Sequence, residues 1–185
     1  FSRETMKNAI SAPHVSGIVR LTGFIIKGTF LFELLGALLM LPVFCSEYGA
    51  EGIWFAVFHS VSAFCNAGFD LMGTKSGEFS SLTHFVAQPV INLTIMLLIV
   101  VGGIGFLVWE DIYRHKWRVR AYRTQSKLVL LVSALLILFP ALYFFFFEFG
   151  DLPLGERILT SLFQSVTPRT AGFNTADLTA IGDTG

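Results

Sequence analysis

Three apolar stretches in this 185-residue chain constrain its fold more than any other feature: residues 28–44, 86–109 and 128–147. The hydrocarbon core of a bilayer is about 30 Å thick, so a spanning helix needs about 20 mostly apolar residues. The second and third stretches meet that length, and the first reaches it by extending back through residues 21–26, with the Lys27 amine drawn to the interface. Charged residues make up only 14% of the chain. We therefore predict an all-α membrane protein.

Two further apolar stretches are too short to cross: residues 53–64 and 157–166. Twelve helical residues extend about 18 Å, roughly half of the distance required. Apolar segments of this length form re-entrant helices or buried core helices.

Basic residues are concentrated on one predicted side of the membrane. Ten of the thirteen precede the first span or fill the link between the second and third: Arg3, Lys7, Arg20, Lys27, Arg114, Lys116, Arg118, Arg120, Arg123 and Lys127. Basic loops remain on the cytoplasmic side, so a complete crossing by residues 53–64 would place the two basic groups on opposite sides. The charge pattern thus favours re-entrance.

The two short stretches end in a repeated motif. "FHSVSAFCNAGFD" at 58–70 matches "FQSVTPRTAGFNT" at 163–175 with a one-residue gap. The repeat predicts span–re-entrant helix–span units. Residues 28–109 form a complete unit, and 128–185 supply the first span and loop of the next. Residues 110–127 form a basic cytoplasmic linker, and 1–27 the cytoplasmic segment from the end of a preceding repeat. We expect the chain to be an internal piece of a longer protein.

The glycine loops suit cation binding. Non-helical backbone at membrane depth is tolerated where it is buried in protein or lines water. Rings of backbone carbonyls replace the hydration shell of a cation in selectivity filters. Gly68 and Gly172 adopt positive φ freely, which lets neighbouring carbonyls turn to a common axis. The helix that precedes each loop directs its negative C-terminal end toward the bilayer centre, and Asp70 adds negative charge beside the first loop.

The alternative is that both Ala-Gly-Phe loops only cap helices, because glycine is common at helix C-termini. The chain would then be a non-conducting scaffold or anchor subunit. An enzyme is a third reading, but the four histidines are scattered and the sequence has no Ser/His/Asp or HExxH pattern. A conduction assay on the complete protein distinguishes a cation-conducting pore from a non-conducting scaffold.

Both segments resemble pore segments of the Trk/Ktr/HKT superfamily of potassium transporters, and most closely those of the membrane subunit of the bacterial Ktr uptake system. The resemblance covers nearly the whole chain, with "FHSVSAFCNAGFDLM" and "FQSVTPRTAGFNTADL" placed as the second and third pore segments. It implies four non-identical span–pore–span repeats, pseudo-fourfold in the full chain, around one conduction path like that of potassium channel subunits. It also implies a multi-pass protein of the plasma membrane that forms a homodimer.

The resemblance assigns the key filter glycines to Gly68 and Gly172. Neighbouring carbonyl donors would be Asn66, Ala67, Phe69, Thr170, Ala171 and Phe173. Glycine at these positions is associated in the family with a preference for potassium over sodium. The resemblance further implies a cytosolic ring of nucleotide-binding regulatory subunits. It also implies potassium uptake that depends on sodium. We expect no catalytic residue and no cofactor in this chain.

The remaining polar features allow more than one role. Arg169 precedes the second loop and either braces it or, if it faces the pore, opposes a cation. The basic stretch at 113–123 is expected to be a cytoplasmic interface, either with anionic lipid or with a cytosolic partner. The thirteen basic and thirteen acidic residues cancel, so net charge predicts no nucleic-acid partner.

Overall fold

The computed structural model describes residues 18–74, 81–150, 152–169 and 171–175. All regular elements within these ranges are helical. The chain divides into two compact units, Phe1–Phe32 and Glu33–Gly185. Of the first unit, the structure describes the opening turns of helix α2 (Ile18–Tyr48). The second unit contains both repeated loops.

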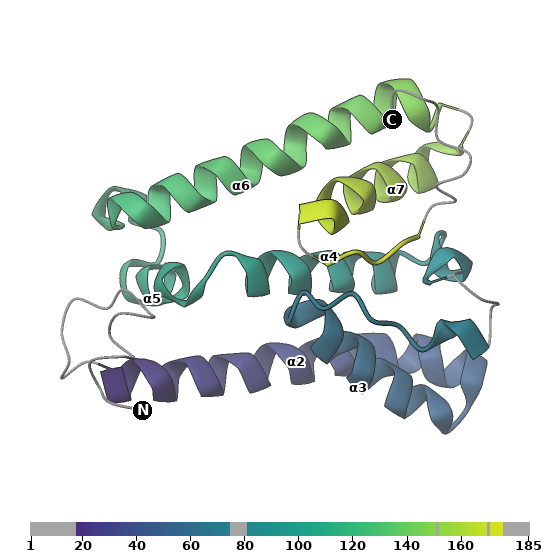
Figure 1. Cartoon of the computed structure of the whole chain (residues 1–185), viewed down its shortest axis with the longest axis horizontal. Helices are drawn as coiled ribbons and strands as arrows, with labels where there is room; N and C mark the ends of the chain where they lie inside the picture. The colour runs from purple at the N-terminus through teal and green to yellow at the C-terminus, as the bar shows by residue number, and fades with distance from the viewer. Residues whose placement is uncertain (1–17, 75–80, 151, 170, 176–185) are drawn as a thin grey trace. The chain divides into compact units, whose positions relative to one another are not determined.

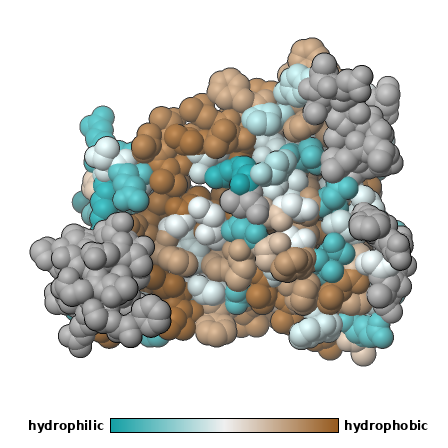
Figure 2. Space-filling view, in the orientation of Figure 1, coloured by the Kyte–Doolittle hydropathy of each residue, from teal (hydrophilic) through white to brown (hydrophobic). Residues whose placement is uncertain are grey.

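The longest helices are apolar along their outer surfaces. Besides α2, these are α6 (Thr124–Tyr143) and α4 (Pro89–Gly103). Large side chains on α6, such as Leu131 and Phe139, are more than half exposed, and Figure 2 shows hydrophobic side chains gathered along this helix. Val19–Tyr48 and Thr124–Glu148 are each long and apolar enough to span a membrane. The prediction of an all-α membrane protein is confirmed, because lipid accounts for apolar surface on this scale.

Helix α3 (Glu51–Phe64) begins directly after α2 and folds back against its end. A Cβ at Gly52 would lie 2.4 Å from the carbonyl of Phe44, so only glycine fits where the two helices approach. After α3 ends, the chain returns toward its starting point, since the Tyr48 hydroxyl contacts Met72 Sδ at 4.0 Å. Met72, beyond the first loop, therefore lies close to the start of α3.

Helix α4 lies between α3 and α7 (Leu154–Val166) (Figure 1). The expected single helix over residues 86–109 is wrong in detail, because α4 ends at Gly103. Helix α5 (Phe106–His115) then begins at a bend of 97°. Gly105 has φ 89°, which L side chains rarely adopt. The break removes the helical partner of the Val101 carbonyl, and Trp109 Nε1 donates to it instead at 2.8 Å.

Helix α6 carries Pro140 and continues into a π-helical turn, Phe144–Glu148. Proline has no N–H, so it leaves the carbonyl four residues earlier without its helical donor. The Ser165 hydroxyl of α7 donates toward this Leu136 carbonyl at 3.3 Å and to Ile137 at 2.5 Å. Arg157 fastens the other end of α7, donating from Nε to the Phe145 carbonyl at 2.6 Å. The third apolar helix thus holds α7 at both ends.

Candidate functional site

The first glycine loop begins with a helix cap that is complete before the glycine. The Asn66 N–H donates to the Ala63 carbonyl at 3.1 Å, and the Ala67 N–H donates to Ser62 at 2.9 Å. Asn66 has φ 54°, so it occupies the left-handed position of a Schellman motif. Gly68 lies beyond this cap and has φ 71° of its own. Capping α3 therefore does not explain the conformation of Gly68.

The second loop is one residue shorter, and its glycine takes part in the hydrogen bonds that follow α7. The N–H groups of Ala171 and Gly172 both donate to the Thr167 carbonyl at 3.1 Å. Gly172 has φ 82°, and a Cβ there would meet nothing within 4 Å. This glycine is required by its backbone conformation rather than by crowding.

A hydroxyl fixes the phenylalanine carbonyl in each loop. Ser62 Oγ donates to Phe69 O at 2.7 Å, and Thr167 Oγ1 donates to Phe173 O at 2.6 Å. The two hydroxyls occupy matching positions of the repeat. Sequence reasoning missed them, although "SVS" and "SVT" were the available signal. Because each bond joins the end of the short helix to the far side of its loop, it sets the curvature of the intervening backbone.

The two loops are in direct contact although they come from different repeats. A Cβ on Gly68 would lie 1.7 Å from the Ala171 carbonyl oxygen and 2.8 Å from its carbon. Beyond the second loop, the Asn174 carbonyl accepts from the Leu82 N–H at 2.8 Å, and its N–H donates to Ser81 Oγ at 3.1 Å. The structure thus brings together the two segments that the sequence singled out, with glycine at the point of closest approach.

The expected filter residues differ in exposure. Phe69 is 70% exposed, whereas Phe173 is 1% exposed. Ala171 is buried, while Ala67 and Gly172 are exposed. Thr170 lies outside the described residues. The side chains of the seven described positions therefore do not all face one environment.

Polar side chains of the two short helices form hydrogen bonds with the backbone around the loops and with the preceding apolar helices. His59 is fully buried, its Nδ1 lies 2.7 Å from the Phe55 carbonyl, and its Nε2 accepts from the Leu71 N–H at 3.4 Å. Both ring nitrogens are used by the neutral Nδ1–H tautomer, so His59 is a structural residue. Ser60 Oγ donates to the Glu33 carbonyl at 2.6 Å, as Ser165 does to α6. Matching serines thus attach both short helices to the preceding apolar helices.

Helix α4 approaches the first loop at a glycine. A Cβ at Gly102 would lie 2.0 Å from the Phe64 carbonyl oxygen. At the opposite end of α4, Asn92 Nδ2 donates to the carbonyls of Phe85 and Gln88, both at 2.8 Å. Gly102 of "VVGGIGF" therefore permits close packing, as small residues do between membrane helices.

The electrostatic arrangement favours a cation near the loops. The C-termini of α3 and α7 lead into them, and neither helix has a basic residue in its last turn. A helix C-terminus is equivalent to roughly half of a negative charge. Arg169 is directed to α6, where its Nη2 donates to Ser133 Oγ at 3.0 Å. Asp70 caps the backbone beyond the first loop by accepting from the Met72 N–H at 2.9 Å.

Comparison with known protein families gives a match over almost the whole chain. A family model described as TrkH, cation transport protein, matches residues 2–185.

Curated relatives agree with this match. The chain is 38% identical over 181 residues to the potassium/sodium uptake protein NtpJ of Enterococcus hirae, covering 95% of this chain and 39% of that protein. It is 32% identical over 182 residues to the Ktr system potassium uptake protein B of Bacillus subtilis, with the same coverage. The protein of that name from Vibrio alginolyticus is 34% identical over 182 residues, covering 94% of this chain and 38% of the relative. The chain spans about two fifths of the length of these relatives.

Proposed function

Because this chain belongs to the TrkH family of cation transport proteins, we propose that it forms part of a pathway for potassium across the cell membrane. The family is one of transporters rather than enzymes, and the chain is a multi-pass membrane protein. Potassium is supported by the names of three relatives, each a potassium uptake protein. The first of these names also includes sodium, which supports a role for sodium in uptake by this protein.

We further propose that the two loops are two strands of a backbone-carbonyl selectivity filter. The observation that carries this proposal is the contact between Gly68 and the Ala171 carbonyl, which joins two repeated loops at a glycine with positive φ. Asn66, Ala67, Gly68 and Phe69 supply one strand; Thr170, Ala171, Gly172 and Phe173 supply the other. The Phe69 and Phe173 carbonyl oxygens each accept one hydrogen bond from a hydroxyl group. One lone pair of each oxygen therefore remains for an ion.

The short helices α3 and α7 act as re-entrant pore helices in this proposal. Each ends at a loop, and contacts beyond the loop return the chain toward the side from which the helix started. Two strands do not surround an ion by themselves. We infer a pseudo-fourfold pore in the whole protein, with further repeats supplying the remaining strands.

The whole protein is proposed to be a homodimer of membrane subunits gated by a cytosolic ring of nucleotide-binding subunits. Relatives named as components of a Ktr system support the presence of other subunits, whereas the dimer and the nucleotide-binding ring are what the family resemblance implies.

A scaffold whose loops only cap helices predicts that Gly68 is part of a cap. The cap of α3 is instead completed by Asn66 and Ala67, and this favours the filter.

Rubidium uptake tests the proposal. The full-length protein is expressed in cells that lack other potassium uptake, and native protein is compared with Gly68→Ser and Gly73→Ser. Gly73 is a suitable control because a Cβ there meets nothing within 4 Å and its φ is not in the left-handed range. The native protein and the control should support uptake that sodium does not compete with, whereas Gly68→Ser should admit sodium. If Gly68→Ser changed neither rubidium uptake nor its competition by sodium, the proposal that the first loop is a filter strand would be wrong.

A further inference from the structure

Helix α5 is placed to lie along the membrane surface. It bends 97° from α4, so if α4 crosses the bilayer, α5 runs nearly parallel to its plane. One face of α5 buries Val108, Trp109 and Asp111, while Tyr113 is 72% exposed. Amphipathic helices with this orientation lie in the region of the lipid headgroups.

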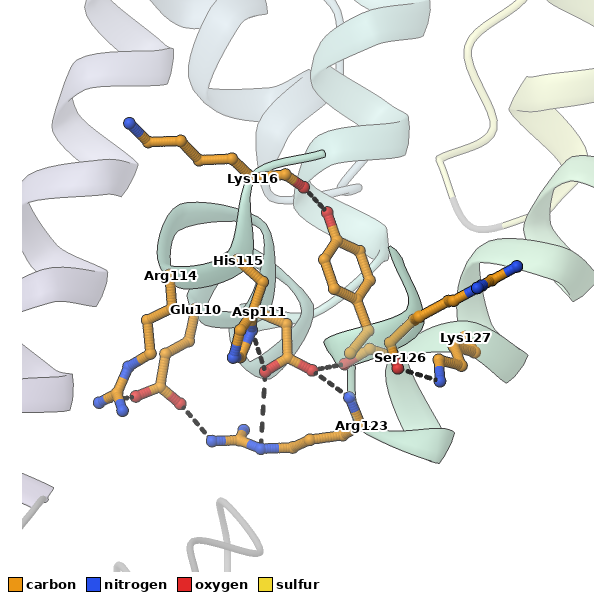
Figure 3. Close-up of polar contacts among 10 residues, drawn as sticks. Glu110, Asp111, Arg114, His115, Lys116, Arg123, Ser126 and Lys127 are labelled. Atoms are coloured by element: carbon orange, nitrogen blue, oxygen red, sulfur yellow. Dashed lines mark hydrogen bonds and ion pairs between the residues drawn. The ribbon is translucent and has the colours of Figure 1, made fainter. Parts of the chain in front are cut away.

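The linker after α5 is folded back on it by polar contacts (Figure 3). The Asp111 carboxylate accepts from Ser126 Oγ at 2.6 Å and from the Arg123 N–H at 2.9 Å. Glu110 pairs with Arg114 at 2.6 Å and with Arg123 at 2.8 Å. The two carboxylates of α5 therefore form their arginine ion pairs with Arg114 and Arg123. They do not pair with the other Lys and Arg side chains of the linker.

Apart from Lys127, whose amine donates to a backbone carbonyl, three cations of the linker remain: Lys116, Arg118 and Arg120. All three are exposed, and they form no ion pair with any residue in the described ranges. Residues 112–127 contain no Asp or Glu. Trp117 lies among these cations and is 96% exposed. We call Lys116, Trp117, Arg118 and Arg120 the linker patch.

The linker patch lies beside the start of the apolar run of α6. The Arg120 carbonyl accepts from Lys127 Nζ at 2.8 Å, and the apolar run of α6 begins at Leu128. The Lys116 carbonyl accepts from the Tyr122 hydroxyl, so the start of the patch is fixed as well. The Arg120 end of the linker patch is thus bonded to the residue that precedes the apolar run of α6, and the Lys116 end is bonded to Tyr122 within the linker.

We propose that the linker patch binds the headgroups of anionic phospholipid in the cytoplasmic leaflet. Three unpaired cations match the negative phosphates of that leaflet, and tryptophan is enriched at the membrane interface because one end of its ring is apolar and the other polar. The placement beside Leu128 favours lipid over a cytosolic protein, since the phosphates lie at that level. The inference does not depend on which cation the protein transports.

Lipid titration of the purified full-length protein tests this inference. The thermal unfolding midpoint is measured in a neutral detergent with added phosphatidylglycerol or phosphatidylcholine. Native protein should be stabilised by phosphatidylglycerol only. In Lys116→Gln/Arg118→Gln/Arg120→Gln, the half-maximal phosphatidylglycerol concentration should rise about fivefold for each cation removed, or on the order of 100-fold in total. The charge-conserving control Lys116→Arg/Arg118→Lys/Arg120→Lys should titrate like native protein.

A second arm needs no variant, since 0.5 M salt should weaken the phosphatidylglycerol effect on native protein. The proposal is overturned if both lipids act equally on native protein, or if the Gln variant keeps the native titration. It is also overturned if the Gln variant loses uptake while phosphatidylglycerol still stabilises it, because the linker patch would then contact a cytosolic protein.

Discussion

The Cα of Gly68 lies against the carbonyl oxygen of Ala171, so closely that a methyl group on Gly68 would be 1.7 Å from that oxygen. No side-chain rotation relieves such a contact, because both partners are backbone. The two loops are consequently coupled, and a change at one is expected to displace the other.

Gly68→Ala should therefore be more disruptive than Gly172→Ala. Both positions have positive φ, which costs about 1–2 kcal/mol for an L side chain, but only Gly68 also faces a clash. Thermal unfolding and rubidium uptake of the full-length variants measure the difference, with Gly73→Ala as the control. Equal effects of the two substitutions would mean that the loops do not touch in the membrane.

Ser62→Ala and Thr167→Val should weaken ion discrimination while leaving the protein folded. Each removes a hydrogen bond to a loop carbonyl, worth about 1 kcal/mol. Without the bond the carbonyl is free to move, so the preference for potassium over sodium should fall, by no more than about fivefold for each bond of 1 kcal/mol. Competition of sodium with rubidium uptake provides the measurement, and Ser62→Thr and Thr167→Ser, which keep the hydroxyl, should behave like native protein. Unchanged competition in both hydroxyl-free variants would show that these bonds do not shape the ion path.

Gly102→Ala should destabilise the protein, and Gly103→Ala should not. The added methyl at Gly102 would overlap the Phe64 carbonyl oxygen at 2.0 Å, whereas at Gly103 the nearest atoms are 3.9 Å away. Overpacking of this kind typically costs about 1–3 kcal/mol. Thermal unfolding of the two purified variants compares adjacent positions on one helix. If Gly103→Ala proved the more harmful, the packing of α4 on α3 would differ from that described.

Asp111 should make folding of the linker dependent on pH. Its burial opposes ionisation, but the hydrogen bonds from Ser126 and Arg123, together with nearby Arg123 and His115, lower the pKa of the carboxyl below its usual value. A lowered folded-state pKa stabilises the fold above the unfolded-state pKa of about 3.9. This contribution is lost as pH falls through the folded-state value.

Asp111→Asn should accordingly lower the free energy of unfolding by about 1.5–3 kcal/mol near pH 7, the range for hydrogen bonds to charged groups. Its unfolding midpoint should then vary less than that of native protein between pH 6 and pH 3. Glu110→Gln is the control and should have a smaller effect, because ion pairs nearer the surface contribute about 0–1 kcal/mol. A native pH profile in Asp111→Asn would contradict the assigned role.

Much of the fold depends on local properties of the chain. The apolar runs are long enough to predict α2 and α6, and the same runs are helical in the structure. The expected short helices at 53–64 and 157–166 are observed as Glu51–Phe64 and Leu154–Val166. Periodicity did not reveal the bend at Gly105, because apolar residues continue across it and α5 differs from α4 only in having one polar face.

The sequence by itself determined that the chain is helical and membrane-embedded, and that two loops share a motif with glycine at one position. These properties depend on length, hydrophobicity and residue identity, which are local. Only the tertiary structure decided that Gly68 meets Ala171, that Asn66 rather than Gly68 completes the cap of α3, and that Ser62 and Thr167 hold equivalent carbonyls. These contacts depend on how separate helices pack and where the backbone turns, and no single segment contains that information.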